Sequence, residues 1–289
     1  MQAARLADGR LHLNHGPIDV VLRAWGSGAA LAEQAALARF PAILPALVGE
    51  LPLLRQAVGE APQGPVARRM HAACAPFAAR GLFITPMAAV AGAVADDLLA
   101  TMRAIAPGLA RAFVNDGGDI AVFAAPGESL AIGLALDPRL ASFDGALRLR
   151  ASFDGALRLR GGDGIGGIAT SGRHGRSFSL GIADAVTVLA RDAATADAAA
   201  TLIANATDLD SPAITRAPAD SLDPDSDLGA RLVTTGIGTL STSEIDTALD
   251  AGTATAAGFI RDGLIIAAAL RLAGASRILG RPFALETPA

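Results

Sequence analysis

The alternation of apolar and polar positions predicts a chain that mixes strands with helices. Two runs with the period-2 pattern of strands flank the turn His15-Gly16-Pro17 near the start. Five later stretches place apolar residues at helical spacing, and Pro41 and Pro45 are expected to divide the first of them. The predicted strands cover residues 10–14, 18–25, 111–114, 120–124, 185–189 and 232–240, and the predicted helices cover 28–58, 65–77, 88–105, a stretch starting near 193, and 243–272.

This order of elements predicts an α+β fold. A chain of 289 residues can bury one large core or two closely packed subdomains. No low-complexity linker separates independent halves, so we expect one domain, residues 1–289, built as two intimately packed lobes. The helix expected at 88–105 carries almost only small residues on one side, which suits close packing on mixed sheets.

A ten-residue segment occurs twice in succession, at Ala141–Arg150 and Ala151–Arg160. Each copy has an Asp-Gly turn signal followed by alternating Leu and Arg, which is typical of a hairpin. Ten is even, so an extra copy keeps the same face of a continuing strand inward. We interpret the repeat as a tandem duplication or a sequence-assembly artefact rather than as a functional repeat.

Composition and charge limit the classes of partner. The net charge of −4 gives no general electrostatic reason to expect nucleic acid. No run reaches the roughly 18 uninterrupted apolar residues of a membrane span, and the first residues show no secretory leader, so we expect a cytoplasmic protein without a membrane partner. Cys74 is the sole cysteine, which excludes internal disulfides and all-cysteine metal sites, and we expect it in the core. A homo-oligomer is left open.

The candidate chemistry is concentrated between Gly167 and Asn205. A Thr-Ser-Gly turn leads into a loop that holds three basic or potentially basic side chains, and an apolar β-branched run and an alanine-rich helix follow. Asp197 and Thr201 lie four residues apart in that helix, so they share one face. A carboxylate and a hydroxyl there form a half-shell for a hard cation such as Mg²⁺. Alternatively, Thr201 only back-bonds within its helix and Asp197 favours the helix N-terminus.

Several long motifs in one order resemble the FAD:protein FMN transferase superfamily, also called ApbE-like proteins, and within it a branch without an assigned function. The resemblance runs from Leu13 to Gly229. The motifs that carry it are ITPMAAVAGAVAD at Ile84–Asp96, NDGGDIA at Asn115–Ala121, GIATSG at Gly167–Gly172, GRSFSLGIADAVTVLA at Gly175–Ala190 and ADAAATLIAN at Ala196–Asn205.

The resemblance implies Mg²⁺ at Asp197 and Thr201, and FAD or a related nucleotide as a small-molecule partner. Glycine turns and hydroxyl groups suit phosphate oxygens, so we expect the nucleotide site in one cleft. Its expected residues are Thr85, Met87, Ala88, Asn115, Gly117, Gly118, Asp119, Thr170, Ser171, Gly172 and Arg176. Read alone, Asn115–Asp119 is a hairpin turn. The glycines of Gly161–Gly167 precede a strand, so we interpret them as a flexible turn rather than a dinucleotide fingerprint.

Two residues depart from the superfamily's pattern. Ala91 stands before Gly92 where the superfamily has a lysine near the flavin nucleotide. Gly181 stands where a pattern like His-Ile-x-Asp-Pro has the histidine required for transfer, although Asp184 is kept. Asp184 and His174 are the candidate catalytic residues for a replacement base. The alternative for His174 is a solvent-exposed loop histidine.

Three functions therefore stay open. The first is a Mg²⁺-dependent flavin- or nucleotide-binding protein that lacks the usual transferase histidine. The second is a non-catalytic ligand-binding or assembly protein that retains the scaffold. The third is an active FAD:protein FMN transferase that uses a replacement base; if the chain is an enzyme, it is expected to be a transferase that acts on a flavin or related nucleotide.

Overall fold

The computed structural model describes residues 1–134, 155–175, 177–280 and 285–286, and the chain divides into two compact units. The first unit comprises residues 1–132, 158–169 and 190–198. The second comprises the described residues of 133–157, 170–189 and 199–289. Helices and strands are mixed along the chain, which confirms the predicted α+β fold.

An antiparallel sheet forms one layer of the first unit, with neighbouring strands in the order β1-β2-β3-β4-β5-β8. In β3, burial alternates strictly, so that Ile18, Val20 and Leu22 point into the core while Asp19 does not. The strands are β1 (Gln2–Arg5), β2 (Leu11–His15), β3 (Ile18–Gly26), β4 (Leu109–Asp116), β5 (Asp119–Ala124) and β8 (Gly167–Ser171), which begins in this unit.

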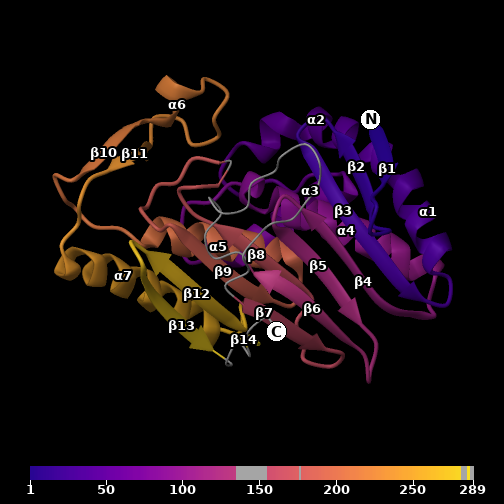
Figure 1. Cartoon of the computed structure of the whole chain (residues 1–289). Helices are drawn as coiled ribbons and strands as arrows, with labels where there is room; N and C mark the ends of the chain where they lie inside the picture. Colours follow the sequence, from indigo (N-terminus) through magenta and orange to yellow (C-terminus); the bar gives the residue numbers. More distant parts are fainter. Residues whose placement is uncertain (135–154, 176, 281–284, 287–289) are drawn as a thin grey trace. The chain divides into compact units, whose positions relative to one another are not determined.

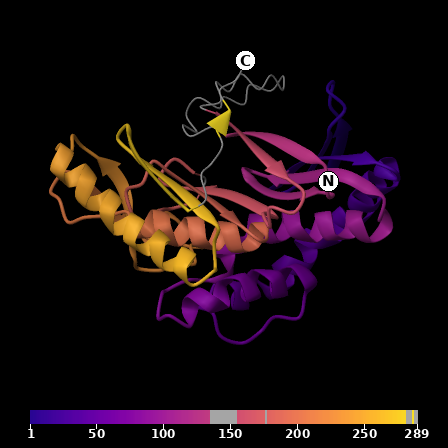
Figure 2. The same cartoon turned by 90° about the horizontal axis from the view of Figure 1, so that it is seen from below.

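Helices cover this sheet in the first unit. The strands β4 and β5 pack against α4, and α3 packs against α4 in turn, so α4 lies between the strands and α3 (Figure 2). Cys74 of α3 is buried, as expected. The helices are α1 (Ala29–Arg39), the 3₁₀ turn η1 (Phe40–Ala42), α2 (Ile43–Leu54), α3 (Pro65–Ala78), the 3₁₀ turn η2 (Pro86–Ala89) and α4 (Val90–Ile105).

The first helical stretch is divided into two helices, as predicted. Pro41 lies in η1, between α1 and α2, but Pro45 lies inside α2. Pro45 takes no part in the division, contrary to expectation, because it falls in the first turn of α2, where the missing N–H would have no partner in the helix. Within the described residues, 29–54 is also the one stretch long and apolar enough to cross a membrane by length and composition alone.

The second unit is built around β12, which pairs antiparallel with both β9 and β13. The helix α7 packs on β12 and β13 (Figure 1), and a capping box between Ser241 and Glu244 begins it. All six residues of β9 are buried. The elements are β9 (Ala185–Ala190), β10 (Ile214–Pro218), α6 (Ala219–Leu222), β11 (Leu232–Ile237), α7 (Thr242–Arg261), β12 (Ala267–Leu272) and β13 (Ala275–Gly280).

The helix predicted at 243–272 is wrong in its last third. It ends at Arg261, because Gly263 adopts a left-handed conformation with φ 69°. The N–H of Gly263 then donates to the carbonyl of Ile260, and the N–H of Leu264 donates to that of Phe259. This is the Schellman arrangement that closes helices at a glycine. The apolar run after it forms β12 instead.

The duplicated decamer is only partly described. Its first copy and the first four residues of the second lie outside the described residues, so the predicted hairpin stays a prediction. The remaining six residues form β7 (Gly155–Arg160), which neighbours β6 (Ser129–Leu134) and pairs with β14 (Leu285–Glu286).

A close crossing of α4 and α5 (Ala193–Ala206) in the first unit gives a direct test of the packing. A Cβ atom added at Gly92 would lie 2.3 Å from the carbonyl oxygen of Ala193. We therefore expect Gly92→Ala to lower the free energy of unfolding by about 1–3 kcal/mol, although alanine is ordinarily the better helix former.

Gly49 of α2 is the matched control, because a Cβ atom there meets nothing within 4 Å. We expect Gly49→Ala to raise stability by roughly 0.5–1 kcal/mol. Urea unfolding of both variants measures the difference. Equal effects of the two substitutions would contradict the crossing.

Candidate functional site

Two helices of the first unit cap one another with carboxylates. The N–H of Gly92, in the first turn of α4, donates to Oδ2 of Asp197 on α5 at 3.1 Å. In return, the first N–H groups of α5, those of Ala193 and Ala194, donate to the two oxygens of Asp96 on α4 at 3.1 and 2.9 Å. A carboxylate at a helix N-terminus satisfies unpaired N–H groups and complements the helix dipole. Each helix therefore satisfies N–H groups at the start of the other, and in α5 this adds to the cap from Asp192, whose Oδ1 accepts the N–H of Thr195 at 2.7 Å.

The capping carboxylate of Asp197 lies in an electrostatically unfavourable place. Burial raises the pKa of Asp197 well above its ordinary value, and the negative charges of Asp119 and Asp116 raise it further. The N–H groups of Gly92 and Ala91 oppose this rise. Carboxylates that repel one another favour a proton or a cation between them.

The structure shows where the predicted metal pair lies on α5, but binding of a metal there stays a prediction. Asp197 and Thr201 lie one turn apart on α5, and both are half-buried. Among the described residues, no group of three or more His, Cys, Asp or Glu side chains is arranged to hold a metal ion. The polar cleft expected around the pair stays a prediction.

Asn115–Asp119 forms the tight turn between β4 and β5. Asp116 pairs with Asp119 across the hairpin, and Gly117 and Gly118 between them have φ values of 67° and 119°. Oδ1 of Asn115 accepts the N–H of Gly118 at 2.8 Å. The hairpin alternative is thus the local structure, and the positive φ angles explain the paired glycines. Whether the turn also binds a nucleotide stays a prediction.

The three other first-unit residues of the predicted nucleotide site lie just before α4. Thr85 is buried, and its carbonyl accepts the N–H of Ala88 at 3.1 Å and the thiol of Cys74 at 3.5 Å. Met87 and Ala88 belong to η2 and are half-buried. This turn leads directly into the part of α4 that Asp197 caps.

The second unit holds the Thr-Ser-Gly segment. Oγ1 of Thr170 hydrogen-bonds to Oγ1 of Thr187 at 2.9 Å, and Ser171 ends β8. Gly172 has φ 148°, and a Cβ atom there would lie 2.6 Å from the carbonyl oxygen of Asp184. Only glycine fits at that position. Arg176 lies outside the described residues, and the convergence of both groups into one cleft stays a prediction.

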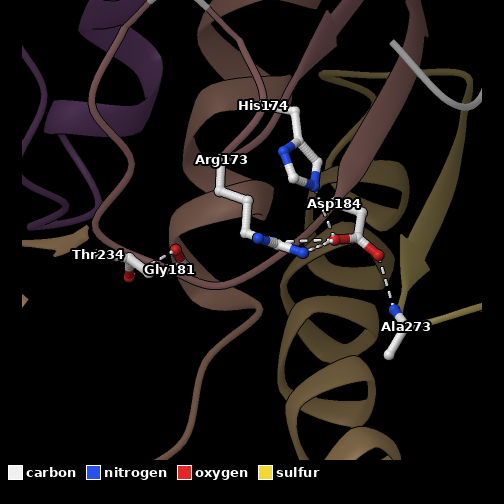
Figure 3. Close-up of polar contacts among 6 residues, drawn as sticks. All are labelled: Arg173, His174, Gly181, Asp184, Thr234 and Ala273. Atoms are coloured by element: carbon white, nitrogen blue, oxygen red, sulfur yellow. Dashed lines mark hydrogen bonds and ion pairs between the residues drawn. The ribbon is translucent and has the colours of Figure 1, made fainter. Parts of the chain in front are cut away.

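Asp184 is the centre of a polar cluster in the second unit (Figure 3). Its Oδ1 accepts Nε and Nη2 of Arg173 at 2.9 and 2.6 Å, and lies 3.2 Å from Nε2 of His174. Its Oδ2 accepts the N–H of Ala273 at 2.7 Å. Ala273 lies in the two-residue turn between β12 and β13. Among the described residues, it is the one non-glycine residue with a positive φ, 47°. The carboxylate thus ties the basic loop to a strained hairpin turn.

Gly181 is enclosed by backbone. A Cβ atom there would lie 2.2 Å from the carbonyl oxygen of Ala204, at the end of α5, and 2.9 Å from that of Thr207. The carbonyl of Gly181 accepts the hydroxyl of Thr234 at 3.0 Å (Figure 3). No side chain fits at this position without a backbone shift.

Sequence reasoning missed Asp96 and Ala273. Asp96 ends the first motif of the resemblance, but nothing in its local pattern indicates that it caps a helix that begins 97 residues later. Ala273 is an ordinary residue before a glycine, and its role depends on the distant Asp184.

A family model and several curated proteins match this chain. A family model described as AbpE bacteria matches residues 3–278. The UPF0280 protein of Methanopyrus kandleri is 38% identical over 148 residues, and that of Methanothrix thermoacetophila is 35% identical over 137 residues. These matches cover 51% and 47% of this chain, and 51% and 50% of the relatives. The chain therefore spans about half the length of the curated relatives it matches.

Two solved structures share the fold. The ApbE protein of Thermotoga maritima superposes with a TM-score of 0.55 at 15% identity, over 96% of each chain. The flavinyl transferase ApbE of Pseudomonas stutzeri, in its apo form, superposes with a TM-score of 0.51 at 14% identity, over 96% of this chain and 94% of that chain.

Replacing Asp96 with asparagine should remove a pH dependence from the stability. Burial raises the pKa of Asp96 to about 6 from 3.8, although its bonds to the N–H groups of α5 oppose the rise. The folded state then holds this proton more tightly than the unfolded state. Relative to Asp96→Asn, the wild type should lose roughly 1–3 kcal/mol as pH rises from about 4 to about 7.

Urea unfolding of both proteins between about pH 4 and pH 8, with EDTA present, measures this. The constant cost of the weaker asparagine cap, about 0.5–2 kcal/mol, cancels from the slope. A difference between the two free energies of unfolding that stays flat across this range would contradict the assignment.

Proposed function

Because the chain belongs to the AbpE bacteria family, which is ApbE-like, we propose that it binds a flavin or a related nucleotide together with Mg²⁺ and lacks the superfamily's usual transfer histidine. The observation that carries the proposal is the carboxylate of Asp197. It is held at the first turn of α4 and repelled by Asp119. A divalent cation at Asp197 and Thr201 would relieve that repulsion.

The nucleotide would lie along the turn Asn115–Asp119, the segment Thr85–Ala88 and the Thr-Ser-Gly segment. Glycines at positive φ let N–H groups approach phosphate oxygens without a side chain in the way. Mg²⁺, when bound, would neutralise phosphate charge. This chain's own residues would orient the phosphates and keep the Asp197 carboxylate in position against Gly92.

The usual route of FMN transfer to a protein threonine is not expected. The residue that matches the required histidine is Gly181, which is enclosed by carbonyl oxygens. Ala91 matches the lysine, so one positive charge near the phosphates is missing. General acid–base help is typically worth about 10²–10⁴-fold in rate. The loss of both groups favours a binding role or a different reaction.

A second candidate is an active transferase with a replacement base. It is favoured by the contact between His174 Nε2 and Asp184. A carboxylate in that position orients the ring and leaves Nδ1 as the nitrogen that would accept a substrate proton. Asp184 would act through His174, because its own oxygens already accept bonds from Arg173 and Ala273. A non-catalytic assembly protein that retains the scaffold is the third candidate.

Flavin binding should depend on Mg²⁺ and on the charge of Asp197. We expect FAD to bind the purified protein at least about tenfold more tightly with Mg²⁺ than with EDTA, a difference of about 1.4 kcal/mol. Asp197→Asn should lose that increment, since the amide can still accept the N–H of Gly92 but carries no charge. Quenching of flavin fluorescence gives the dissociation constants.

The exposed Asp250 on α7 supplies the matched control, because its side chain is 72% exposed and Asp250→Asn removes the same charge. Equal affinity with and without Mg²⁺ would remove the metal from the proposal. A protein that carries no flavin and ignores added FAD would favour the assembly protein.

Covalent transfer should be absent. We expect no FMN on an acceptor domain after incubation with FAD and Mg²⁺, as read by mass spectrometry, while an active flavinyl transferase modifies the same acceptor. Gly181→His should not restore transfer, since the added side chain meets backbone oxygens. Robust transfer that Asp197→Ala and His174→Ala both abolish would overturn this prediction and establish the replacement base.

A further inference from the structure

A cavity of about 310 Å³ opens in the first unit, and none of its described lining residues belongs to the proposed nucleotide site. Its walls come from the end of α4, the far half of β5, the end of β7 and the glycine-rich segment before β8. A smaller cavity of about 180 Å³ shares Arg103 and Phe123 with it. On β5 the larger cavity begins at Val122, whereas the turn toward the nucleotide site begins at Asp119.

Three arginines line this cavity, and none of the described residues that line it is acidic. They are Arg103 on α4, Arg160 at the end of β7, and Arg191 just before α5. All three are exposed, and within the described part of the chain none of their side chains forms an ion pair or hydrogen bond with a carboxylate. The nearby Asp163 accepts the backbone N–H of Arg160 at 2.8 Å. Three arginines therefore line one hollow, and no described carboxylate pairs with their guanidinium groups.

One of these arginines is held in place. The guanidinium of Arg103 stacks over the ring of Phe123, 4.2 Å from its centroid. Stacking of this kind fixes the plane of the guanidinium, so the side chain loses less conformational entropy when an anion binds. The stack also forms the wall that the two cavities share.

The glycine segment gives the cavity an open floor. Gly162 and Gly164 have φ values of 100° and 76°, and a Cβ atom at either would meet nothing within 4 Å. A ligand can therefore approach the main chain closely there. The sequence alone indicated only a flexible turn at Gly161–Gly167. In the structure, residues of this segment line the same cavity as the three arginines.

We propose that this arginine cavity binds a small molecule that carries two or more phosphate groups. The volume lies at the lower end of the range for small-ligand sites, and arginine matches phosphate oxygens with paired, directed N–H groups. A single phosphate would leave much of the positive charge unused. The proposal does not rest on the proposed flavin function, since the two sites share no residue.

Titration with inorganic pyrophosphate tests the site. The Nε–Hε NMR signals of Arg160 and Arg191, assigned from their absence in Arg160→Gln and Arg191→Gln, should shift in a saturable way at low salt with EDTA. Calorimetry should give binding at least about tenfold weaker in each single variant and about a hundredfold weaker in the double variant. All three arginines are exposed, so the variants should fold.

Arg68→Gln is the control, because Arg68 is exposed on α3 and does not line the cavity. It removes the same charge and should leave the affinity unchanged. Citrate, a carboxylate polyanion, should bind at least about tenfold more weakly than pyrophosphate. The proposal would be overturned if the wild type failed to bind pyrophosphate, or if the signals of Arg160 and Arg191 did not shift on titration. It would also be overturned if Arg68→Gln weakened binding as much as the cavity variants, or if citrate bound as tightly as pyrophosphate.

Discussion

The close crossing of α4 and α5 at Gly92 is the constraint on which the candidate site depends. Because no Cβ atom separates the helices, the first turn of each comes within hydrogen-bond reach of a carboxylate on the other. A bulkier residue at Gly92 would separate Asp197 from α4 and Asp96 from α5 together. Helix packing, helix capping and the placement of the candidate metal ligand are therefore one interaction and not three.

In the second unit, one carboxylate likewise serves two partners. Asp184 accepts hydrogen bonds from the guanidinium of Arg173 and from the backbone N–H of Ala273 in the strained turn. Removing this carboxylate would lower the free energy of unfolding, because a guanidinium and a backbone N–H would lose their hydrogen-bond partner. This gives Asp184 a structural reason to be present whether or not the chain is an enzyme. Its presence is thus no argument for transfer chemistry.

Local pattern predicted the elements whose cause is local. The hairpin around Gly16, the buried run of β9 and the start of α5 follow from alternation, β-branching and composition. The helix predicted through Leu272 failed although its stop signal was present, because Asp262-Gly263 is a typical helix ending that apolar periodicity outweighed. The partners of Asp96, Asp184 and the arginine cavity lie far away in sequence, and no spacing rule reports them.

The backbone around Gly181 leaves no room for a side chain. Three backbone carbonyl oxygens of residues 204, 205 and 207 occupy the space that a side chain would need. A histidine there requires the end of α5 to move, and with it the bond from Ile182 N–H to the carbonyl of Thr207. Under the proposed function, transfer chemistry would need other groups, such as the ring of His174, whose Nε2 lies 3.2 Å from Oδ1 of Asp184.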